Sequence, residues 1–155
     1  MSGAAQDGTR LADRLEIVAL SDGFAHGLDH GDVDGFLELF TDDVVYVNGA
    51  RRLNGKAELE RFFRARAESG RISRHMYSGL CIVFAGPDAA TGTSVWLTFA
   101  GDGPLPVEST VPFVVADISD DYRRADGKWL IARREISAVF VNRDIKPLPT
   151  TVQKP

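Results

Sequence analysis

The chain has 155 residues and a formal net charge of −4, with 44% hydrophobic and 26% charged residues, which is typical of one folded domain and excludes a disordered chain. It lacks a basic excess for nucleic acid or anionic membranes, a secretion signal, and any apolar run near the roughly 20 residues that span a bilayer. The single cysteine, Cys81, excludes an internal disulfide, so we expect a cytoplasmic protein without nucleic acid or membrane partners.

The first half of the sequence predicts helices and one short strand. Residues 1–9 are small and polar and should form a disordered tail. Thr9 can cap a first helix, and Asp32 can cap a second, shorter one. The expected elements are a helix from residue 10 to the glycines of 27–31, helices over 33–40 and 56–68, and a strand over 44–47.

The second half predicts strands. Four segments rich in Val, Ile, Thr, Phe and Trp are separated by short turns that contain Gly, Pro and Asp, which favours an antiparallel meander. Prolines after Asn142 cannot continue a sheet, so residues 143–155 should form an extended arm, leaving one domain over 10–142. The four segments are 72–84, 91–100, 109–124 and 128–141.

The order of elements, helices first and strands afterwards, predicts an α+β architecture with the helices on one face of the sheet. A strongly curved sheet covered by helices encloses space between the two layers. We therefore expect a small-molecule ligand in an enclosed pocket there.

Five local phrases in this order resemble the SnoaL-like branch of the nuclear transport factor 2-like family. The resemblance covers residues 10–142 and implies a cone-shaped domain, three helices packed on a curved, mostly antiparallel sheet. It leaves the activity open, because the family includes lyases, isomerases, hydrolases and oxygenase small subunits. The phrases are GLDHGDVDGF (27–36), LFTDDV (39–44), LNGKAEL (53–59), SRH (73–75) and YRRADGKW (122–129).

The resemblance also implies a catalytic pair. Scytalone dehydratase, bile-acid dehydratase and hexachlorocyclohexane dehydrochlorinase share an aspartate and a histidine, at the positions that match Asp29 and His75 here. The second histidine of scytalone dehydratase-like enzymes has no counterpart in residues 91–100, and the lysine of the dehydrochlorinase has none at residues 23–25. The chain thus departs from both patterns.

Chemistry supports the same two residues. A histidine can abstract a proton at neutral pH, and a carboxylate on its other nitrogen fixes the tautomer. Period-two alternation places His75 on one strand face with Cys81, which we expect in the core, and helical spacing aligns Asp29 with Asp22. The alternative is that Asp29 caps the turn at Gly31 and that His75 is an ordinary hydrogen-bonded residue.

Four aromatic residues are candidates for substrate binding: Phe24, Tyr46, Trp96 and Phe140. Tyr46 and Trp96 combine a ring with a polar group that could hold a hydroxyl or carbonyl of a flat ligand, and core packing is the alternative.

Three other polar residues have structural explanations. His26 and His30 have metal-ligand spacing, but no third ligand accompanies them, so a solvated helix end is expected, with His30 at the pocket mouth as the alternative. A buried Arg134 would need an acid or a ligand oxyanion. A β-bulge would instead leave it in a surface ion pair with Asp120 or Asp121, which is the expectation.

Together these observations predict a cofactor-independent lyase or isomerase, dehydratase-like, without a metal, that acts on a small, largely apolar, cyclic molecule. The alternative is a non-catalytic binding or assembly subunit, like the small subunits of ring-hydroxylating dioxygenases. The outer sheet face should be apolar and form a homodimer or homotrimer. Its expected residues are Met76, Leu80, Ile82 and Phe84.

Overall fold

The computed structural model describes residues 10–108 and 111–145. The tail expected at 1–9, the Thr9 cap and most of the arm expected at 143–155 lie outside the described residues. The helices are α1 (Leu11–His30), α2 (Val33–Leu37) and α3 (Gly55–Glu68). The strands are β1 (Phe40–Asn48), β2 (Arg51–Asn54), β3 (Ile72–Phe84), β4 (Ala89–Gly101), β5 (Val114–Ala125) and β6 (Lys128–Val141).

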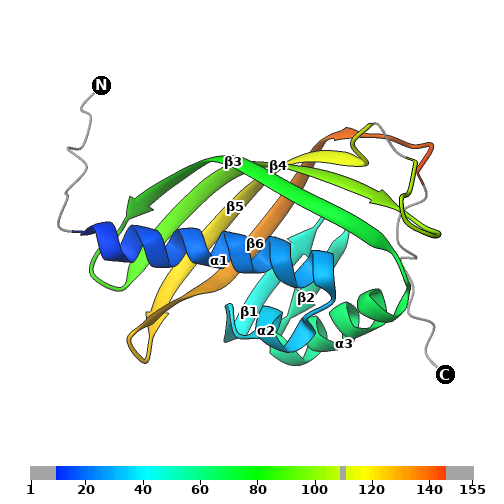
Figure 1. Cartoon of the computed structure of the whole chain (residues 1–155). Helices are drawn as coiled ribbons and strands as arrows, with labels where there is room; N and C mark the ends of the chain where they lie inside the picture. Colours follow the sequence, from blue (N-terminus) through cyan, green and yellow to red (C-terminus); the bar gives the residue numbers. More distant parts are fainter. Residues whose placement is uncertain (1–9, 109–110, 146–155) are drawn as a thin grey trace.

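The six strands form one curved sheet in the order β2-β1-β6-β5-β4-β3, and all pairs are antiparallel except β1 with β6. The three helices lie on one face of this sheet, with α1 crossing the long strands and α3 near β1 and β2 (Figure 1). The expected α+β cone and the meander are confirmed. Among the described residues, no helix has the length and apolarity to cross a membrane.

Several elements differ from expectation. Strand β1 begins at Phe40 instead of residue 44, and β5 begins at Val114 instead of residue 109. Strand β2 was not predicted, and it forms a hairpin with β1 around Gly49, whose φ is +57°. The second helix ends at Leu37 instead of continuing to residue 40, because Phe40 already pairs with Ile131 of β6.

Helix α1 buries one stripe and leaves another exposed. Its buried positions recur every three or four residues, which directs Phe24 and Leu28 toward the sheet. Leu11 and Leu15, the beginning of a second apolar stripe, are each 60% exposed. The first turn is fixed through Asp13, which accepts hydrogen bonds from Trp129, Arg10 and Arg124 that lower its pKa to about 2.

A β-bulge in β3 changes which side chains face the core. The pairing with β4 shifts register between Ser78 and Cys81, and Gly79 within this step has a φ of +67°, a backbone conformation that favours glycine. Beyond the bulge Ile82 is buried, whereas Cys81 is exposed. The expectations of a core Cys81 and of an outward-facing Leu80, Ile82 and Phe84 were therefore wrong, because the bulge reverses the alternation.

The expected surface position of Arg134 was also wrong. Its side chain is fully buried and donates Nε and Nη2 to the two carboxylate oxygens of Asp120, at 2.8 and 2.7 Å. Tyr122 donates its hydroxyl to the same carboxylate at 2.8 Å. The guanidinium lies 4.0 Å from the ring centre of Phe24. The ion pair of Arg134 with Asp120 thus joins β6 to β5 in the core, beneath Phe24 of α1.

Candidate active site

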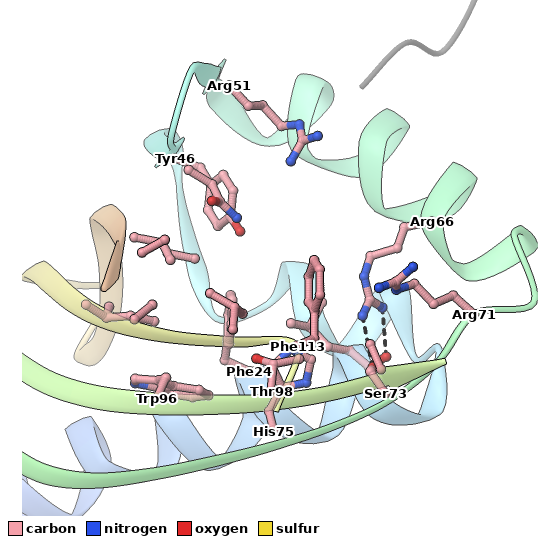
Figure 2. A pocket seen from close by; sticks show the side chains of 18 of the residues that line it. Phe24, Tyr46, Arg51, Arg66, Arg71, Ser73, His75, Trp96, Thr98 and Phe113 are labelled. Carbon is pink, nitrogen blue, oxygen red and sulfur yellow. Dashed lines mark hydrogen bonds between the residues drawn. The ribbon is translucent and has the colours of Figure 1, made fainter. Parts of the chain in front are cut away.

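A cavity of about 280 Å³ lies between the sheet and the helices, at the end of the cone near α3. This volume is near the lower end for small-molecule sites. Figure 2 shows Arg51 and Arg66 on the β2–α3 side, with Trp96 and His75 on the strands opposite. The apolar wall of the cavity includes Phe24, Leu28, Phe62, Phe63, Trp96, Phe113, Ile118 and Ile136. The polar residues that line the cavity are Tyr46, Asn48, Arg51, Arg66, Arg71, Ser73, His75 and Thr98.

Asp29 and His75 are in direct contact at this cavity. Nδ1 of His75 lies 2.6 Å from Oδ1 of Asp29, and the two side chains are only 10% and 7% exposed. A carboxylate oxygen can only accept, so in the neutral imidazole Nδ1 carries the proton and Nε2 does not. Nε2 makes no hydrogen bond to a described residue, and the ring lines the cavity. The imidazole thus presents a basic nitrogen to a ligand.

Two further donors orient the carboxylate. The backbone N–H of His75 donates to Oδ2 of Asp29 at 2.8 Å, and the hydroxyl of Ser73 donates to Oδ1 at 3.0 Å. Burial alone would raise the pKa of Asp29, but these bonds and the His75 ring hold it below its usual value. Asp29 therefore remains a carboxylate at neutral pH and cannot rotate away from the imidazole without losing several bonds.

Tyr46 reaches the cavity from β1 and is 3% exposed. Burial raises the pKa of its phenol, although the Asn48 side chain and the charges of Arg134, Arg51 and Arg66 act to lower it. The phenol is thus neutral at pH 7 and can donate a hydrogen bond to an oxygen on a ligand.

Trp96 and Phe24 contribute apolar surface to the cavity. The indole of Trp96 stacks on Tyr77 at 4.8 Å between ring centres and meets Phe24 edge-on at 5.5 Å. Its Nε1 donates to the hydroxyl of Ser94 at 2.8 Å. The N–H is therefore occupied, and the expectation that it would hold a substrate oxygen is not supported by the geometry.

Phe140, the fourth expected aromatic, does not line the cavity. The pairing of β5 with β6 shifts between Val115 and Ala116, so that Ala138 and Val141 face the cavity while Phe140 is 68% exposed on the other face. A bulge again reverses the alternation that the sequence suggests.

His26 and His30 contact each other with their rings tilted and the ring centres 4.5 Å apart, and both are exposed. Neither lines the cavity. In the part of the chain that the structure describes, no three His, Cys, Asp or Glu side chains are grouped closely enough to hold a metal ion.

Sequence reasoning missed several cavity residues. Ser73 lies two residues before His75, so the two-residue period of a strand places both on one face. Arg66 lies three and four residues after Phe63 and Phe62, so the helical period places it on the inward face of α3. Both residues could therefore have been predicted from the sequence. Thr98 pairs with His75 across β3 and β4 and lines the cavity, on the strand that contains no second histidine.

The structure is a curved sheet covered by helices, with a largely apolar pocket between the two layers and an aspartate–histidine pair at this pocket. The chain belongs to the SnoaL-like domain family, which matches residues 9–135. No curated protein matches the chain.

The solved structures that share the fold include two proteins from Novosphingobium aromaticivorans and a dehydrochlorinase. A protein from Novosphingobium aromaticivorans assigned as a scytalone dehydratase is 19% identical, with a TM-score of 0.75 over 92% of this chain and 97% of that chain. A hexachlorocyclohexane dehydrochlorinase of type 2 is 18% identical, with a TM-score of 0.73 over 97% of this chain and 98% of that chain. The third structure is the β subunit of a protein assigned as an aromatic-ring-hydroxylating dioxygenase, also from N. aromaticivorans. It is 15% identical, with a TM-score of 0.74 over 86% of this chain and 94% of that chain.

Proposed function

We propose that the protein is a cofactor-independent lyase or isomerase of the dehydratase type, acting on a small cyclic molecule within the cavity. The observation that carries this proposal is the 2.6 Å contact between Asp29 and His75, with the imidazole lining an apolar pocket. A paired histidine with an unbonded Nε2 next to ligand-sized space is the arrangement that proton abstraction requires.

In this mechanism Nε2 of His75 removes a proton from a carbon beside a carbonyl, and the C–H electron pair forms a double bond. Asp29 stabilises the resulting imidazolium, and the phenol of Tyr46 donates a hydrogen bond to the carbonyl oxygen as charge develops there. The imidazolium then returns its proton. Transfer to a leaving hydroxyl releases water, which is a lyase reaction, and transfer to another carbon is an isomerase reaction.

Deuterium exchange tests this function before the natural substrate is known. Small cyclic ketones and β-hydroxy ketones are incubated with the protein in D₂O, and deuteration of the carbon next to the carbonyl is followed by NMR. We expect exchange above the buffer rate with at least one compound, and its loss in His75→Gln. If a compound that binds in the cavity undergoes neither exchange nor elimination, the binding-subunit alternative, favoured by the dioxygenase β-subunit neighbour, replaces the proposal.

The outer sheet face supports a homodimer or homotrimer. Met76, Leu97, Val115 and Phe140 lie in register across β3 to β6, and Met76 and Phe140 are 53% and 68% exposed. An apolar row across four strands is typical of an interface. Light scattering should give two or three times the 16.9 kDa chain mass.

Phe140→Asp should shift this assembly toward the monomer. Leu105→Asp is the matched control, because Leu105 is 73% exposed but lies in the connection between β4 and β5. A wild-type monomer at micromolar concentration would contradict the assembly.

A further inference from the structure

Arginines dominate the charge at the cavity. Three arginines line it: Arg51 on β2, Arg66 on α3 and Arg71 just before β3. The nearby acid, Asp29, is already bonded to His75, and we call these two residues the dyad. Figure 2 shows the guanidinium of Arg51 on the β2 side of the space, whereas the side chain of Arg66 reaches from α3 toward Ser73 on β3. The cavity therefore combines an apolar wall with arginine side chains that reach it from separate parts of the chain.

Arg66 has no carboxylate partner. It donates Nη1 to the carbonyl of Leu28 at 2.9 Å and Nη2 to the hydroxyl of Ser73 at 3.0 Å, both neutral acceptors. Within residues 10–108 and 111–145, no Asp or Glu oxygen lies within 4.0 Å of its guanidinium nitrogens. Burial lowers the pKa of Arg66 and Arg71 adds to this effect, while Tyr46 and the more distant carboxylate of Asp29 oppose it without reversing it.

Arg51 is held differently but is equally without an acid among the described residues. Its guanidinium lies 4.2 Å from the ring centre of Phe62, a contact that uses its flat face. It makes no hydrogen bond to a described residue, so its N–H edge remains available at the cavity. Several arginines elsewhere on this protein contrast with it, since Arg64, Arg123, Arg124 and Arg134 each pair with at least one carboxylate.

We propose that the cavity selects a ligand with a carboxylate on its apolar ring system, and that Arg66 and Arg51 bind this carboxylate. Arginine is suited to the role because its planar N–H edge matches a carboxylate in two parallel hydrogen bonds. A partly buried guanidinium is costly without an anion, and a ligand carboxylate supplies the missing charge.

The role of the carboxylate in catalysis rests on the proposed function, in which His75 is the base. Arg66 is linked to the dyad, since Ser73 accepts from Arg66 and donates to Asp29. A carboxylate held at Arg66 would fix the ligand ring relative to His75, so that one particular C–H faces Nε2. The inference therefore narrows the substrate class to cyclic carboxylic acids, with the carboxylate serving as a handle and not as the reacting group.

Matched acids and amides test the assignment by calorimetric titration, independently of turnover. The probes are benzoate, cinnamate and 2-naphthoate, each paired with its carboxamide, which keeps the shape and removes the charge. We expect at least one acid to bind at least tenfold more tightly than its amide. Arg66→Gln and Arg51→Gln should each reduce this preference severalfold. Arg61→Gln should not, because Arg61 is on the same helix but exposed and outside the cavity.

Each outcome is decisive. Equal binding of acid and amide, no binding of any pair at millimolar concentration, or an equal loss in Arg61→Gln would overturn the assignment. Arg51→Gln keeps the test valid if Arg66→Gln does not fold, because Arg51 makes no bond to α1 or β3. His75→Gln should retain the acid preference. Acid-selective binding without deuterium exchange would therefore reject the catalytic proposal alone, and exchange of neutral ketones without acid preference would reject this inference alone.

Discussion

Replacing Asp29 with asparagine should slow deuterium exchange by about 10³- to 10⁴-fold while leaving the fold intact. The amide can donate to Nδ1 of His75 and thereby move the imidazole proton to Nε2, the nitrogen that must accept a proton from the ligand. The measurement is the NMR exchange rate at saturating ketone, with circular dichroism and thermal melting to show that the variant is folded.

The control is Asp22→Asn, on the same helix. Asp22 accepts a hydrogen bond from Tyr77 at 2.5 Å but does not line the cavity, so its replacement should change the rate by less than about twofold. The double variant of Asp29→Asn with His75→Gln should be no slower than the slower single variant, because the pair acts as one unit. Additive losses would show that the two residues act separately.

The pH profile separates the two partners of the dyad. The folded pKa of Asp29 lies below its usual 3.8, so its stabilising contacts are complete above that value and are lost as the pH falls further. Between about pH 5 and 8 the carboxylate charge is therefore constant, and a fall of the exchange rate toward acid in this range must come from a group other than Asp29. The same fall in a variant without His75 would assign it to another group.

Replacing Asp120 with alanine should lower the free energy of unfolding by about 3–5 kcal/mol, because it leaves the buried charge of Arg134 without its counter-ion. For a domain of this size the melting temperature should fall on the order of 10 °C. Urea unfolding, with the denaturant dependence compared between variants, measures the effect.

Asp117→Ala is the matched control, since Asp117 lies on the same strand with an exposed side chain, and it should change stability by less than about 0.5 kcal/mol. The double replacement of Asp120→Leu with Arg134→Met removes both charges and should recover most of the loss. If the double variant is as unstable as the single one, the network stabilises through its shape rather than through charge pairing.

Local sequence patterns predicted the long strands well. Strands β3 and β6 have the expected bounds, 72–84 and 128–141, because β-branched and aromatic residues fill them and glycine turns end them. Strand β2, Arg-Arg-Leu-Asn, was missed because four mostly polar residues carry no alternation. The parallel pairing of β1 with β6 joins segments far apart in sequence, which local patterns do not encode.

The dyad residues were found because two phrases of the sequence resemble a family, and Asp29 and His75 do lie in contact. Side chains beyond a bulge were misplaced, Cys81 and Phe140 among them, since one extra residue reverses inward and outward positions. For Arg134 the sequence named Asp120 as one of two possible partners, but the pair was expected at the surface, and the register of β5 with β6 buries both side chains instead.

The bulge at Gly79 divides β3 into two segments, one that lines the cavity and one that packs in the core. Residues 72–78 carry Ser73 and His75 at the cavity, and residues 80–84 anchor the far end of the cone through Ile82. Because the register restarts at the glycine, the first segment can accept new side chains without re-aiming those of the second. The strand is thus modular, and a library that varies residues 73, 75 and 98 can explore new pocket chemistries on an unchanged scaffold.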